Sequence, residues 1–147
     1  PHLAVLGRVP GIAGSYRDVE RHPEATPVPG VLVVRLDAPL YYANALTASD
    51  RVLEVVEAAD PKPRAIVFDA TALDSLDITS AEMLEKLVTR LRADGVELVV
   101  AEAHAPVVAF ARRTGLLTHI GEDRFYPTVD AAVRALETHA AVPAPRR

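Results

Sequence analysis

Hydroxyl and carboxylate side chains are concentrated in one stretch of the chain, between Phe68 and Leu87. An apolar run ends there at Asp69, and a helical pattern begins near Ser80. The polar residues between those points are Thr71, Asp74, Ser75, Asp77 and Thr79. A helix N-terminus offers unpaired backbone N–H groups and a partial positive charge, which favour a bound anion or a phosphate attached to a hydroxyl. Thr79 and Ser80, with Asp77 beside them, are therefore candidates for phosphorylation.

The same residues also fit a purely structural role. The sequence Thr79-Ser80-Ala81-Glu82 matches a capping box, in which the Thr79 hydroxyl accepts from the Glu82 amide and the Glu82 carboxylate accepts from the Thr79 amide. We therefore predict that Thr79 acts chiefly as the cap of the following helix. The loop from residue 71 to 80 would then be an exposed interaction surface, with Leu76, Ile78 and Glu82 as its contacts.

The composition excludes several classes of partner and site. The 147 residues include 16 Lys and Arg against 20 Asp and Glu, a net charge of −4. Without a long basic cluster, this charge argues against nucleic acid or an anionic membrane as the main partner. The chain has no cysteine, which removes disulfides, thiolate catalysis and cysteine metal sites. The histidines are scattered without the spacing of metal ligands, so we predict no metal site and no cofactor.

The motifs of common enzymes are missing too. Gly7, Gly11 and Gly14 do not have the order of a phosphate-binding loop, and there is no GxSxG elbow. We predict that the chain is not an enzyme. A small nucleotide-hydrolysing enzyme is therefore the least supported of the functions considered for this chain.

Apolar runs rich in β-branched residues predict five strands. They lie at residues 3–6, 31–36, 65–68, 96–101 and 124–126. The continuous apolar character of residues 65–68 indicates burial on both faces, as in a parallel sheet. The long stretch from Gly7 to Gly30 holds four prolines and is predicted to be irregular.

Helical spacing predicts four helices between and after these strands. The first is capped by Thr47 and Asp50 and carries an apolar stripe of Leu46, Leu53 and Val56. The others begin near Ser80, Ala105 and Thr128. The alternation predicts an α/β fold with a mainly parallel sheet. We expect one domain over residues 3–140, preceded by a linker in residues 1–30 that contains the short first strand, and a disordered tail at 141–147.

This organisation places the polar stretch at the carboxyl edge of the sheet, where helix N-termini and strand ends meet. We expect an anion or nucleotide to bind there, and to bind weakly, because neither the loop after Leu36 nor the loop after Phe68 contains an arginine or a lysine. The residues predicted for this site are Asp37, Tyr41, Asn44, Asp69, Thr79 and Ser80. Tyr41 and Tyr42 could form a ligand platform, but aromatic loop residues more often fold back onto the core, as we predict here.

The strand at 65–68 followed by "LDITSAEMLEKLVTRLRADGVELVVAEA" resembles the STAS domain, which is shared by sulfate transporters and anti-sigma factor antagonists. In the antagonists an aspartate is followed two residues later by a phosphorylatable serine or threonine at the start of a helix. That pattern falls here on Asp77 and Thr79. The resemblance implies an anti-sigma factor antagonist-like fold with about four helices.

A longer stretch, "LGRVPGIAGSYRDVERHPEATPVPGVLVVRLDAPLYYANA" from Leu6 to Ala45, is similar to the segment that joins the membrane part of SulP (SLC26-type) anion transporters to their STAS domain. This resemblance implies a non-catalytic regulatory domain on the cytoplasmic face of the cell membrane. Its partners would be the membrane domain of its own transporter and further subunits of a homo-oligomer. Pro1 would then mark a boundary within a longer protein. The alternative is a stand-alone anti-sigma factor antagonist that acts as a phosphorylation-controlled interaction switch.

Overall fold

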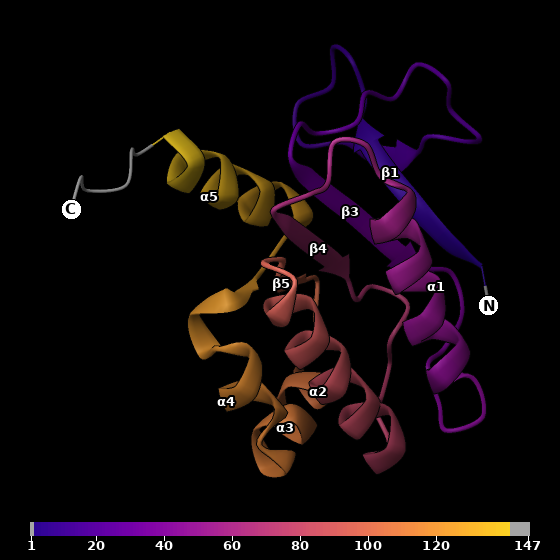
Figure 1. The fold of residues 1–147 in the computed structure, drawn as a ribbon, viewed down its shortest axis with the longest axis vertical. Helices are drawn as coiled ribbons and strands as arrows, with labels where there is room; N and C mark the ends of the chain where they lie inside the picture. The colour runs from indigo at the N-terminus through magenta and orange to yellow at the C-terminus, as the bar shows by residue number, and fades with distance from the viewer. Residues whose placement is uncertain (1, 142–147) are drawn as a thin grey trace.

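The computed structural model describes residues 2–141 of the chain (Figure 1). Its sheet has six strands in the order β2-β1-β3-β4-β5-β6. Their bounds are β1 (Leu3–Arg8), β2 (Tyr16–Asp18), β3 (Val31–Leu36), β4 (Ala65–Asp69), β5 (Glu97–Ala101) and β6 (Phe125–Tyr126). β1 is antiparallel to β2 and β3, whereas β3 to β6 are parallel to one another. The predicted α/β fold with a mainly parallel sheet is confirmed.

Five α-helices lie within residues 2–141, one more than predicted. They are α1 (Ala45–Ala58), α2 (Ile78–Ala93), α3 (Ala105–Thr114), α4 (Leu116–Ile120) and α5 (Val129–Ala141), with a short 3-10 helix at Glu122–Arg124. The helix that begins at Ala105 was predicted to end at Gly115, which is in the left-handed conformation at φ 83°, and this is confirmed, but α4, which follows that glycine directly, was not predicted. α5 begins as predicted at Thr128, whose hydroxyl accepts a hydrogen bond of 3.0 Å from the Ala131 amide. Among these helices, none combines the length and apolar character that crossing a membrane would need.

The sheet is buried on both faces. All five residues of β4 are buried, which accounts for its uninterrupted apolar sequence. Ile66 and Phe68 pack with α1 to α4 on one face, whereas Ala65 and Val67 pack with α5 on the other. α5 stands apart from the other four helices in Figure 1. The chain therefore forms a three-layer arrangement with two separate apolar cores.

The first thirty residues, predicted to contain a linker, supply two strands of this sheet. β1 lies between β2 and β3 in the sheet. β2 falls within the stretch from Gly7 to Gly30, which was predicted to be irregular, so the sequence pattern missed this strand. The backbone of Arg8 pairs with that of Thr26 through two hydrogen bonds of 2.8 Å. Gly7 permits this approach, because a Cβ atom there would lie only 2.8 Å from the Thr26 carbonyl carbon. Of the predicted tail, residues 142–147 lie outside the described residues.

Candidate functional site

Asp77 connects the loop before α1 to the N-terminus of α2, at the carboxyl edge of the sheet. It is the N-cap of α2: its Oδ1 accepts from the Ser80 amide at 2.7 Å. Its Oδ2 accepts from the Tyr42 amide, also at 2.7 Å, in the loop before α1. The Ser80 amide, and with it the Tyr42 amide, lowers the pKa of Asp77 below its ordinary value, because these donors favour the ionised carboxylate. The predicted capping box at Thr79 is wrong, since α2 begins two residues earlier than Ser80.

The earlier start of α2 changes what each predicted switch residue can do. Thr79 is exposed in the first helical turn, whereas Ser80 is fully buried and its hydroxyl faces no solvent. A kinase could therefore reach Thr79 but not Ser80 in this conformation. Among the predicted contact residues, Glu82 is exposed, but Leu76 is half-buried and packs against the core.

The loop before α1 is held by Asn44. Its side-chain oxygen accepts from the Tyr41 amide at 2.9 Å, and its side-chain nitrogen donates to the Pro39 carbonyl at 2.8 Å. α1 begins at Ala45, and its N-cap residue, Asn44, makes no capping hydrogen bond with its side chain. The predicted cap of Thr47 and Asp50 is therefore wrong. The sequence pattern did not indicate the true start of α1, because the buried residues of its first turns, Ala45, Ala48 and Ser49, are small and do not form a recognisable apolar stripe.

Four large apolar side chains project from this edge into solvent. Their exposed fractions are 48% for Tyr41, 71% for Tyr42, 72% for Leu46 and 64% for Ile78. The Tyr42–Asp77 hydrogen bond keeps the first loop beside the residue that precedes Ile78. We call Tyr41, Tyr42, Leu46 and Ile78 the apolar rim. The predictions that Leu46 lies on a core stripe and that the two tyrosines fold back onto the core are wrong, whereas Ile78 is exposed as expected.

The residues predicted to bind an anion lie at this edge of the sheet, but they do not give it a net positive charge. Asp69 is buried and accepts from the Thr71 amide at 3.0 Å. Arg35 donates to Asp37 at 2.6 Å, and that hydrogen bond raises the pKa of Arg35, so its charge is already paired. Asp77 occupies the N-terminus of α2, where a free anion would bind. Anion binding here stays a prediction, and the geometry favours weak binding.

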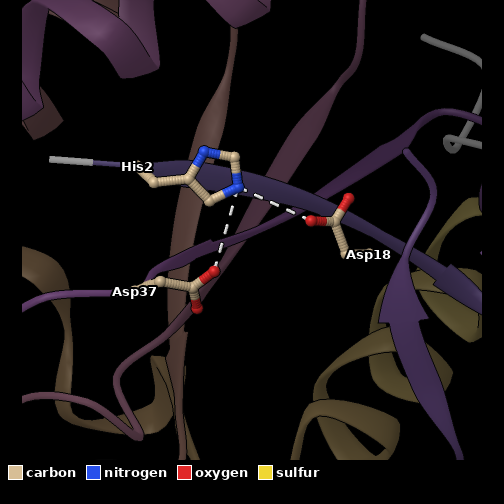
Figure 2. A group of neighbouring side chains, drawn as sticks. All are labelled: His2, Asp18 and Asp37. Atoms are coloured by element: carbon tan, nitrogen blue, oxygen red, sulfur yellow. Dashed lines mark ion pairs between the residues drawn. The ribbon is translucent and has the colours of Figure 1, made fainter. Parts of the chain in front are cut away.

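A second polar group lies on the α5 face of the same edge, at its β1 side. The imidazole of His2 lies between the carboxylates of Asp18 and Asp37 (Figure 2). His2 Nε2 is 3.5 Å from one Asp18 oxygen and 3.9 Å from one Asp37 oxygen. Asp18 is buried, and its pKa stays below the ordinary value although burial opposes this, because the Glu20 amide and His2 both favour the carboxylate. Sequence spacing could not reveal this group, since its members come from the N-terminal end of β1, from β2 and from the end of β3.

The family model for the STAS domain matches residues 22–132. A probable sulfate transporter of Mycobacterium tuberculosis H37Rv is 38% identical over 135 residues, which cover 92% of this chain but 24% of that protein. A probable sulfate transporter of Arabidopsis thaliana, number 4.2, is 32% identical over 91% of this chain and 21% of its own length. The chain thus spans about a quarter of the length of the M. tuberculosis relative.

Solved structures agree on the fold. The murine Solute Carrier 26 family member A9 anion transporter superposes with a TM-score of 0.84 at 19% identity, over 93% of this chain and 22% of that one. An anti-sigma factor antagonist from Mycobacterium paratuberculosis superposes with a lower TM-score of 0.58, over 75% of this chain. The family match decides the assignment: the chain belongs to the STAS domain family, and relatives that match over more than nine-tenths of it are probable sulfate transporters.

Proposed function

We propose that this chain is the regulatory and interaction domain of a SulP-type transporter of inorganic anions, sulfate included, and that it lies on the cytoplasmic face of the membrane. The observation that carries the proposal is the apolar rim. Tyr42, Leu46 and Ile78 are each more than half exposed at one edge of the domain. Large exposed apolar side chains gathered at one place are typical of a surface that meets another protein.

The partner proposed for the rim is the membrane domain of the same transporter. Relatives that match over more than nine-tenths of this chain are about four times as long and are sulfate transporters. The hydrogen bonds of Asp77 and Asn44 fix both loops of the rim, so the surface is pre-organised and little order must be gained on docking. The transport step itself belongs to the rest of such a protein, and this domain contributes gating and subunit contact within a homo-oligomer.

Anion uptake by the full-length transporter tests this assignment. Leu46→Ser and Ile78→Ser should lower uptake at equal membrane abundance, because loss of a buried contact at an interface costs about 1 kcal/mol or more. The same variants should change the stability of the isolated domain by less than about 0.5 kcal/mol, since both side chains are exposed. Ile12→Ser is the matched control, because Ile12 is 58% exposed but lies in the loop between β1 and β2, past the end of β1 that is opposite to the rim. Wild-type uptake in both rim variants would refute the docking role.

A second candidate function rests on the exposure of Thr79. Its hydroxyl lies in the first turn of α2, two residues after Asp77, and is free of any capping role. Phosphorylation there would make the domain an antagonist-type interaction switch. Thr79→Asp should then alter partner binding or uptake, whereas Thr79→Ala should not. Equal behaviour of the two variants would leave only the transporter-domain proposal.

A further inference from the structure

The carboxyl edge of the sheet carries three side chains that the proposed function does not use: His2, Asp18 and Asp37. Backbone pairing puts Ala4 opposite Arg35 and Leu6 opposite both Val33 and Asp18. Because side chains alternate between faces along a strand, His2 and Asp37 project to the same face as Asp18. Three residues from distant parts of the sequence therefore meet on the α5 face of the sheet, beyond the apolar core.

Each carboxylate has one oxygen held in place by the protein. Oδ1 of Asp18 accepts from the Glu20 amide at 2.9 Å, and Oδ1 of Asp37 accepts from Arg35 at 2.6 Å. The other oxygen of each carboxylate, Oδ2, is directed at His2 Nε2 (Figure 2). Outer contacts of this kind orient carboxylates that bind metal ions.

The second observation is the state of Asp18 Oδ2. Asp18 is only 5% exposed, and among the described residues this oxygen is buried without any hydrogen-bond partner. A buried carboxylate oxygen without a donor is costly, because nothing replaces the water that it loses. Arg21 does not satisfy it, since its Nε is 3.9 Å away and its side chain is 74% exposed. The oxygen lies on the side of His2 and Asp37, where His2 Nε2 is 3.5 Å away and forms an ion pair with it only when the imidazole is protonated.

The spacing of the three atoms suits one metal ion. Ligand bonds of about 2.0–2.2 Å in a tetrahedral site place neighbouring ligand atoms about 3.4 Å apart. Here the imidazole nitrogen lies 3.5 and 3.9 Å from the two carboxylate oxygens, and all three ligand atoms lie within 4.8 Å of one another. One imidazole and two carboxylates form a nitrogen and oxygen set that suits Zn²⁺ and related divalent transition ions, whereas Mg²⁺ prefers oxygen ligands alone. Arg35 and Arg21 oppose a cation and should moderate its affinity.

We propose that His2, Asp18 and Asp37 form a binding site for one divalent transition-metal ion, with Zn²⁺ as its representative. His2 Nε2 and the Oδ2 atoms of Asp18 and Asp37 are the protein ligands, and the remaining position is open to water. The ion would tie the start of β1 to the ends of β2 and β3, and so would fix the segment through which the chain enters the domain.

Isothermal titration of ZnCl₂ into the untagged 147-residue chain tests the site. We expect one Zn²⁺ ion per chain, which excess MgCl₂ does not displace. In NMR spectra of the labelled chain, Zn²⁺ should shift amide signals centred on residues 2, 18 and 37. His2→Gln and Asp18→Asn should each weaken Zn²⁺ binding at least about tenfold. His22→Gln is the matched control, because His22 also faces a carboxylate, Glu24 at 3.3 Å, but no second one.

The histidine variant keeps the test valid even if Asp18→Asn disturbs the fold, because His2 is 45% exposed and its replacement should leave the domain folded. Co²⁺ gives an independent readout through the absorption bands of a tetrahedral site, which His2→Gln should remove. Absence of Zn²⁺ binding, or equal weakening in His22→Gln, would overturn the proposal.

Discussion

The carboxylate of Asp77 makes the hydrogen bonds that hold the rim together, one to the loop before α1 and one to the first turn of α2. An N-cap of this kind contributes about 1 kcal/mol, and the bond to Tyr42 adds to it. Asp77→Ala should therefore lower the free energy of unfolding by about 1–2 kcal/mol in chemical denaturation. Thr79→Ala is the control and should change it by less than about 0.5 kcal/mol, because Thr79 caps nothing. A larger loss for Thr79→Ala than for Asp77→Ala would contradict this assignment.

Asp77 should also make stability depend on pH. Its pKa is lower in the folded chain than in the unfolded chain, so its contribution is complete above the ordinary pKa of aspartate and is lost as pH falls through the folded-state pKa. Asn can still cap a helix but cannot ionise. The difference in free energy of unfolding between the wild type and Asp77→Asn should therefore shrink as the pH is lowered from about 6 to 2. A constant difference over this range would show that the charge of Asp77 is not involved.

At the scale of elements, the N-terminus of α2 is occupied by the protein's own anion. Asp77→Asn removes that negative charge but leaves the helix dipole, which favours an anion at this end of α2. Titration of sulfate or nucleotide should therefore shift the amide signals of residues 37–47 and 74–82 more strongly in Asp77→Asn than in the wild type. Shifts confined to Arg112 and Arg113 in both proteins would reject this edge as an anion site.

The close approach of β1 to the backbone of Thr26 depends on one glycine. A Cβ atom at Gly7 would lie 2.8 Å from the backbone of Thr26, and backbone cannot move aside as a flexible side chain can. Gly7→Ala should lower the free energy of unfolding by about 1–3 kcal/mol, as overpacking does elsewhere. Arg17→Ala, at an exposed position of β2, should change it by less than about 0.5 kcal/mol. Equal effects would show that the β1 contact with residue 26 is not tight.

For the whole molecule, two cores on opposite faces of one sheet make α5 indispensable. Ala132 and Val133 of α5 are fully buried against the sheet, where they cover Val67 and Val99. Deletion of residues 128–147 would expose that face, so the shortened chain should lose cooperative unfolding and aggregate. Deletion of residues 142–147 alone is the control, and the sequence prediction of a disordered tail there leads us to expect an unchanged unfolding transition. Cooperative unfolding of the chain that lacks α5 would show that the second core is dispensable.

Strand and helix identity followed from local pattern wherever the pattern was strong. The continuous apolar run of β4 and the end of α3 at Gly115 were predicted correctly, because burial on both faces and a helix stop each leave a local signature. Helix starts were less certain. α1 begins at Ala45 and α2 follows its N-cap, Asp77. In both cases the sequence also contains a threonine slightly later, with an acidic residue three positions after it, that could cap the helix. Only packing against the sheet decides between such alternative starts.

The sequence by itself determined the α/β class, the mainly parallel sheet and the resemblance to SulP-type STAS domains. These depend on hydrophobic periodicity and on motifs that are contiguous in the chain. Tertiary structure alone decided which side chains share a site. Tyr42 meets Asp77 across 35 positions, and His2 meets Asp18 and Asp37 through the antiparallel pairing of β1 with β2 and β3. Strand order and register set these contacts, and neither leaves a local trace in the sequence.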